Sequence, residues 1–143
     1  MEQTFEIQPF DTRLMEQLNR LLPPEWSSNA YDVFMYNEWQ PWFHAFQIKK
    51  GDKLVAFGLI IHQGDVAWLG WILVDVKFRK QGYGMAMTRF LVEKSYALGA
   101  KTIVLTATEL GLPLYEKLGF KTESSYRFFR RGSSPKQRSN HAS

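Results

Sequence analysis

The sequence predicts a mixed α/β fold, in which a mostly antiparallel sheet carries helices on both faces. Apolar, strand-like segments at 43–50, 53–63 and 66–76 are separated by Gly-Asp pairs, which are typical of hairpin turns. A segment with helical spacing at 84–99 separates the third of these from another apolar strand at 102–107. Because two strands joined by a helix run parallel, the sheet contains one βαβ crossover.

The residues before these strands predict a strand and two helices. Residues 4–8, "TFEIQ", alternate between apolar and polar side chains, as in a short strand. Asp11 is suited to cap the first helix. The apolar residues of that helix recur at helical spacing and are Leu14, Met15, Leu18 and Leu21. The second helix is expected to begin with Ser27 or Ser28 as its cap and to end at Pro41.

The residues after these strands complete the order βααβββαβαβ. In the crossover helix Gly99 is the expected C-terminal cap. Its apolar stripe consists of Met87, Phe90, Leu91 and Ala97 or Leu98. A short helix should follow the strand at 102–107, with Pro113 in its first turn and Gly119 at its end. Residues 120–131 are then predicted to form one closing strand.

Composition limits the class of protein. The chain has 143 residues, 45% of them hydrophobic, which suits one domain with a buried core. It contains no cysteine, so disulfides and thiolate metal sites are excluded and a reducing compartment is expected. Its first residues lack the pattern of a signal peptide, and the apolar run Val66–Val74 is about half of a membrane span. We expect a cytoplasmic protein without membrane or metal.

Positive charge is concentrated at the C-terminal end. The formal net charge is +4, and the last 17 residues contain no acid. Their basic residues are Arg127, Arg130, Arg131, Lys136 and Arg138. The remainder has 13 basic and 14 acidic residues, a net charge of −1. We therefore expect one domain over 1–131, a flexible basic tail over 132–143 and no nucleic-acid partner, although a nucleic-acid-binding module that uses this tail is an alternative.

The segment 74–87, "VDVKFRKQGYGMAM", passes from a strand into a helix through two glycines. The first turn of a helix has unpaired N–H groups and a partial positive charge, so it can bind an anion. Gly82 and Gly84 would let the anion approach closely, and Arg79 and Lys80 add positive charge. The segment does not match the P-loop motif, and it lacks the third glycine that a dinucleotide-binding fingerprint requires. The pattern indicates a phosphate site, although a purely structural turn would also explain the glycines.

This segment resembles the acyl-CoA signature of the GNAT N-acetyltransferase superfamily, V-x-P-x-x-R-x-x-G-x-G/A. The matching positions are Val74, Arg79, Gly82 and Gly84. Residues 112–120, "LPLYEKLGF", are similar to a second element of the family, and the resemblance covers roughly 55–129. Two departures are Val76 in place of the family proline and "TATELG" in place of an asparagine-containing segment.

The resemblance implies a GNAT-type domain that moves an acetyl group from acetyl-CoA to a primary amine by direct attack in a ternary complex. In this family the strand before the signature carries a bulge and splays from its parallel neighbour, and pantetheine lies in the opening. The residues implied to bind the cosubstrate are Val74, Val76, Arg79, Lys80, Gln81, Gly82, Tyr83, Gly84 and Met85. The Val74 amide would stabilise the oxyanion, and Tyr115 matches the tyrosine that acts as general acid, the alternative being a core tyrosine.

The general base and the acceptor stay open. Glu109 is the candidate base, with Asp75, His62 or a water-relayed base as alternatives. Among the aromatic residues of the second helix region, Trp39 and Trp42 are candidates to contact the amine, although core or dimer packing would also explain them. The partner is expected to be a small-molecule or peptide amine, with a possible homodimer. An alternative function is a non-catalytic acyl-CoA sensor.

Overall fold

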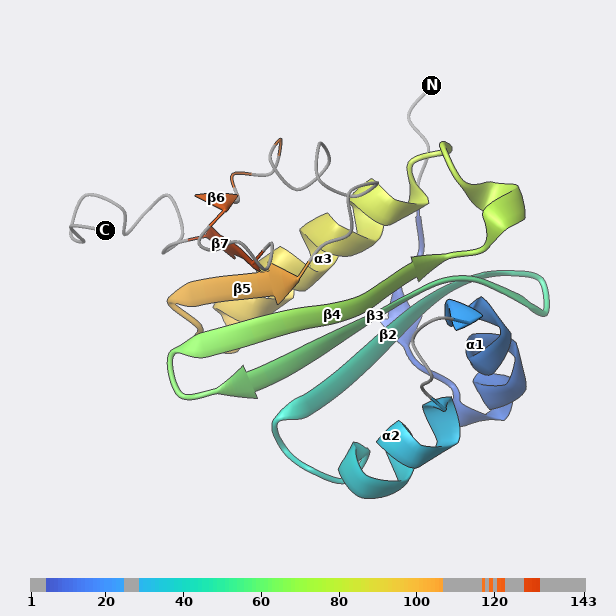
Figure 1. The fold of residues 1–143 in the computed structure, drawn as a ribbon, viewed down its shortest axis with the longest axis horizontal. Helices are drawn as coiled ribbons and strands as arrows, with labels where there is room; N and C mark the ends of the chain where they lie inside the picture. Colours follow the sequence, from blue (N-terminus) through green and yellow to red (C-terminus); the bar gives the residue numbers. More distant parts are fainter. Residues whose placement is uncertain are drawn as a thin grey trace.

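The computed structural model describes residues 5–24, 29–106, 117, 119, 121–122 and 128–131. Within this part of the chain, seven strands form one sheet in the order β1-β2-β3-β4-β5-β7-β6 (Figure 1). The strands are β1 Gln8–Pro9, β2 Phe43–Lys50, β3 Lys53–Gln63, β4 Val66–Val74, β5 Thr102–Thr106, β6 Lys121–Thr122 and β7 Phe128–Arg131. Of the pairings between described strands, only that of β4 with β5 is parallel.

Helices cover both faces of this sheet, as the sequence predicts (Figure 1). The helical elements are η1 Thr12–Leu14, α1 Met15–Leu21, α2 Ala30–Asn37, η3 Val76–Phe78 and α3 Tyr83–Ala97. On one face, Met87 and Leu91 of α3 are fully buried in a core cluster with β2–β5. On the other face, Leu18 of α1 and Phe34 of α2 belong to a second cluster with β2–β4. The predicted fold class and its single crossover are confirmed.

Three strand predictions need correction: those of the first and last strands, described next, and that of β4, which ends at Val74 and not at residue 76. β2 and β3 have the predicted bounds, whereas the first strand is not 4–8 but β1, where Pro9 is paired with β2. An edge strand tolerates the missing N–H of a proline. The closing segment 120–131 forms not one strand but two, β6 and β7, which pair antiparallel with each other. The short helix predicted around Pro113 lies outside the described residues.

The helix caps are partly as predicted. Asp11 caps η1, because its carboxylate accepts a hydrogen bond from the Arg13 N–H. The cap of α2 is Asn29, whose side chain accepts from the Tyr31 N–H at 2.8 Å, and not Ser27 or Ser28, which lie outside the described residues. Asn and Ser are equally good caps, so residue type could not separate these positions.

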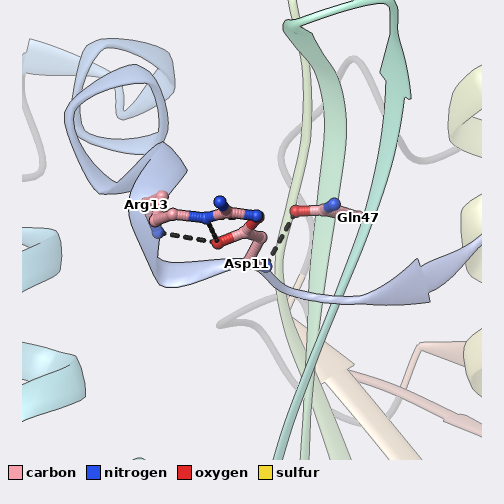
Figure 2. Close-up of polar contacts among 3 residues, drawn as sticks. All are labelled: Asp11, Arg13 and Gln47. Carbon is pink, nitrogen blue, oxygen red and sulfur yellow. Dashed lines mark hydrogen bonds and ion pairs between the residues drawn. The ribbon is translucent and has the colours of Figure 1, made fainter.

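A polar corner joins the sheet to α1 (Figure 2). The Asp11 N–H donates to Oε1 of the buried Gln47 on β2 at 3.0 Å. The Arg13 side chain donates to the Asp11 carboxylate, and this contact lowers the pKa of Asp11 from 3.8 to about 2. The chain is thus fixed where it leaves the sheet edge and enters α1.

Two further side chains of α1 hold the helical layer in place. Gln17 donates to the Asp52 carbonyl at 2.9 Å and accepts from the Leu54 N–H at 2.8 Å, which ties α1 to the β2–β3 hairpin. Asn19 accepts from the Ala30 N–H at 2.9 Å, which ties α1 to the start of α2. The position of α2 over the sheet follows from these contacts.

Gly58 of β3 sets how closely α3 approaches the sheet. A Cβ atom at this position would lie 2.7 Å from Cδ1 of Leu91 and 3.0 Å from Cγ of Met87. Both side chains are fully buried and have little room to move. A larger residue here would push the helix and the strand apart.

We predict that Gly58→Ala destabilises the fold more than Gly70→Ala on the neighbouring β4. A Cβ at Gly70 meets no atom within 4 Å, and both substitutions reduce the entropy of the unfolded chain alike. The free energy of unfolding from urea denaturation should therefore differ by about 1–3 kcal/mol between the two variants. Equal stabilities would contradict close packing at Gly58.

Two histidines on β2 and β3 are buried at their Nε2 atoms. Neither His44 nor His62 has a described hydrogen-bond partner for this atom. The pKa of His44 is lowered from 6.5, first by burial and then by the positive charges of His62 and Lys94, against a smaller opposing effect of the Pro41 carbonyl. Protonation of His44 is therefore less favourable in the folded state than in the unfolded chain.

It follows that the fold should lose stability as the pH drops below about 6.5, because the unfolded chain then binds a proton that the folded His44 takes up only at lower pH. The free energy of unfolding, measured by urea denaturation between about pH 7.5 and pH 5, should decrease less in His44→Gln than in the wild type. Identical pH dependence in the two proteins would assign the loss to other groups.

Candidate active site

A β-bulge interrupts the pairing of β3 with β4. Between two paired positions β3 contributes only Gly58, whereas β4 contributes Trp71 and Ile72. Trp71 has φ +48°, a left-handed conformation that costs a non-glycine residue about 1–3 kcal/mol. The bulged strand that the family resemblance implies is therefore present.

β4 is also longer than the described part of β5. The paired residues of β4 and β5 are Val66–Leu69 and Thr102–Leu105. Past this point, Gly70–Val74 have no β5 partner in the part of the chain that the structure describes. We call Gly70–Val74 the open edge of β4.

The peptide groups of Val74 face away from β3. The next residue, Asp75, donates its N–H to the Val55 carbonyl of β3 at 2.8 Å. Successive residues of a strand turn their peptide groups to opposite sides, so those of Val74 point to the open edge. The Val74 carbonyl accepts from Nε of Arg79 at 3.3 Å on that side. The Val74 N–H is thus suited to donate to a ligand that lies along the edge.

The start of α3 provides further backbone donors. Its N-cap is Gly82, at φ +93°, and no side chain caps the helix. The Ala86 N–H bonds to the Gly82 carbonyl, so the N–H groups of Tyr83, Gly84 and Met85 have no acceptor within the helix. By contrast, η1, α2 and η3 all begin with an Asp or Asn side chain that accepts from the backbone. An anion can take this place at α3.

Basic side chains surround this helix start. Lys77, Arg79 and Lys80 are exposed in the loop between β4 and α3, and Lys80 has φ +62°. Left-handed residues of this kind concentrate where a backbone shape is needed for function. The combined charge of these side chains and of the helix start favours a phosphate group.

Several predicted site residues have specific places in this loop. Val76, expected on the strand, lies in η3 and is 71% exposed, because β4 ends at Val74. The Tyr83 side chain is buried edge-to-face against Phe5 and Phe78, so only its N–H is available to a ligand. The side chain of Gln81 donates to the Lys77 carbonyl at 3.3 Å.

Of the candidate bases, two are poorly placed. Asp75 caps η3 and forms an ion pair with Lys53 at 3.3 Å. Burial acts to raise the pKa of Asp75, but the hydrogen bonds from Lys77 and Lys53 outweigh it, so the pKa is lowered. His62, expected at the surface, is half-buried and pairs with Ala67, about 23 Å along β4 from Val74. Tyr115 and Glu109 lie outside the described residues.

A pocket of about 270 Å³ lies against the start of the open edge, on the face that α2 covers. It is lined by Val33, Asn37, Phe43, Leu59, Ile61, Trp68, Leu69, Gly70 and Trp71. Neither predicted acceptor residue belongs to the described lining: Trp39 is 88% exposed, and the half-buried Trp42 packs at the border of the second core cluster. Sequence reasoning missed Trp68 and Trp71, although their position before the glycine signature was a usable signal.

Within the described residues, no helix is long and apolar enough to cross a bilayer. The same residues contain no group of three or more His, Asp or Glu side chains arranged to hold a metal.

The fold and this site define a class of α/β protein in which an open strand edge leads into a helix start that has no side-chain cap. The family model described as the acetyltransferase (GNAT) family matches residues 12–120. The chain therefore belongs to the GNAT family.

Similarity to known proteins supports this family assignment. An uncharacterised N-acetyltransferase of Bacillus subtilis, YitH, is 35% identical over 59% of this chain and 29% of its own length. The alanine N-acetyltransferase of ribosomal protein bS18 from Escherichia coli is 32% identical over 52% of this chain and 53% of its own. The chain thus spans about half or less of these relatives. An aminoglycoside 6'-N-acetyltransferase solved with coenzyme A has the same fold, with TM-score 0.75, 21% identity and coverage of 91% and 98%.

We predict that Gly82→Asp weakens acetyl-CoA binding more than Gly82→Asn. Both substitutions place a side chain at φ +93°, where its Cβ would lie 3.3 Å from Cζ of Phe5. The difference in affinity between the two variants therefore measures the effect of a negative charge beside the diphosphate. Calorimetry should give a Kd at least about tenfold higher for the aspartate variant. Equal affinities for the two variants would place the diphosphate elsewhere.

Proposed function

We propose that the chain is an N-acetyltransferase that uses acetyl-CoA and a primary amine. The observation that carries this proposal is the bulged open edge of β4 beside the uncapped start of α3. Membership of the GNAT family supports it, as do relatives that are named N-acetyltransferases.

In this proposal the cosubstrate is held mainly by backbone. N–H groups from Gln81 to Met85 bind the diphosphate, with Arg79 and Lys80 adding charge. Hydrogen bonds to a charged oxygen contribute about 1.5–3 kcal/mol each. The pantetheine arm pairs with the edge at Val74, and Val76 contacts it from η3.

The reaction is a direct transfer. The neutral amine attacks the acetyl carbonyl, so that an N–C bond forms and the C–S bond of the thioester breaks. The Val74 N–H stabilises the oxyanion, because it points to the open edge. Tyr115 gives its hydroxyl proton to the leaving sulfur, and the excess proton on nitrogen passes to Glu109 or to water.

We predict that Tyr115→Phe lowers kcat about 100-fold and leaves the Kd for acetyl-CoA unchanged, because the variant removes only the proton donor. Steady-state kinetics and calorimetry measure the two quantities. Tyr36→Phe is the matched control, since Tyr36 is 75% exposed on α2. An unchanged kcat in Tyr115→Phe would show that another group donates the proton to the leaving sulfur. If the wild-type protein binds acetyl-CoA but transfers its acetyl group to none of the amines tested, a non-catalytic acyl-CoA sensor is favoured.

A further inference from the structure

The pocket beside the open edge indicates which amine the protein accepts. We propose that it selects a small arylalkyl primary amine, an inference that rests on the proposed function. Its location, its size and the chemistry of its lining support this class.

The pocket meets the open edge at Gly70 and Trp71, about 10–13 Å along β4 from Val74, whose N–H is the proposed oxyanion donor. Leu69 is the last residue of β4 with a β5 partner, and Gly70 and Trp71 begin the open edge. The remaining lining comes from α2, β2, β3 and the outward side chain of Trp68, on the face opposite α3. A group held in the pocket reaches the open edge from the α2 face of the sheet. The proposed diphosphate site lies at the start of α3, on the opposite face.

The size of the pocket limits the acceptor. Its volume is about 270 Å³. A cavity of about 150 Å³ holds a benzene molecule, and pockets for drug-sized ligands begin near about 300 Å³. One aromatic ring with a short aminoalkyl arm fits between these limits.

The lining favours an apolar body with a cationic end. None of the described lining residues is charged. Asn37 is the described lining residue with a side-chain acceptor, and its Nδ2 donates to the Val33 carbonyl at 2.7 Å, which holds the amide in place. The indole rings of Trp68 and Trp71 can stack on an aromatic ring and attract an ammonium group. A polyhydroxylated or phosphorylated amine would lose hydration here without compensation.

The first test compares acceptors with the wild-type protein and acetyl-CoA. The probes are 2-phenylethylamine and tryptamine against kanamycin, glucosamine 6-phosphate and a peptide with N-terminal alanine. We expect kcat/KM for the arylalkylamines to be at least about 100-fold higher. Preference for a polar amine or the peptide, with acetyl-CoA still bound in calorimetry, overturns the inference and leaves the proposed function intact. Absence of acetyl-CoA binding overturns both.

The second test fills the pocket. A Cβ at Gly70 meets no atom within 4 Å, so Gly70→Leu can extend into this space without displacing the backbone. The KM for 2-phenylethylamine should rise about tenfold or more; because Gly70 belongs to the open edge, the unchanged Kd for acetyl-CoA is expected of the α2 variant Val33→Leu. Val33→Leu should act in the same direction from α2, and Met35→Leu is the matched control, because Met35 is 67% exposed. An unchanged KM in both pocket variants would overturn the inference.

Discussion

The extra residue in β4 is the constraint on which the site depends. Before the bulge, Ala67 and Leu69 face α3, whereas after it Ile72 and Val74 do, and Leu73 joins the cluster on the opposite face. One inserted residue has therefore reversed the alternation of the strand. The same reversal decides which peptide groups bond to β3 and which face the open edge. A regular β4 would turn the Val74 N–H toward β3, and the donor proposed for the oxyanion would be lost.

The proposed cosubstrate site consists mainly of backbone donors at Val74 and at the start of α3. The start of α3 has no side-chain cap, and the open edge of β4 has no described β5 partner. These donors depend on few particular side chains. They need a glycine at the left-handed position before α3, which is Gly82, and a β4 that is longer than the described part of β5. The strained Trp71 contributes to the same arrangement, and its ring packs against Phe57 at 6.4 Å between centroids, which helps to offset the strain.

The sequence predicts β2 and β3 to the residue, because continuous apolar segments end at Gly-Asp turns where Gly51 and Gly64 have positive φ. The bulge could not be predicted from the same pattern. In "VAWLGWILV" nearly every residue is apolar, so a reversal of alternation leaves no trace. The pattern consequently predicts a strand that continues to Val76, whereas β4 ends at Val74. Trp39 shows a second limit, since aromatic density cannot tell that this residue lies in the turn after α2 with an exposed side chain.

The sheet separates the two proposed binding sites. On the α3 side, backbone donors and basic side chains suit a ligand of fixed chemistry, because substitution of side chains there changes little of the donor geometry. On the α2 side, side chains of separate elements line the pocket. Gln17 holds α1 on the β2–β3 hairpin, and Asn19 of α1 holds the start of α2, by hydrogen bonds that do not involve the pocket. Substitution of residues such as Val33 and Ile61 would therefore change the shape of the proposed acceptor pocket without disturbing the open edge. Among the described residues, the proposed acceptor pocket shares Gly70 and Trp71 with the open edge, beside the bulge.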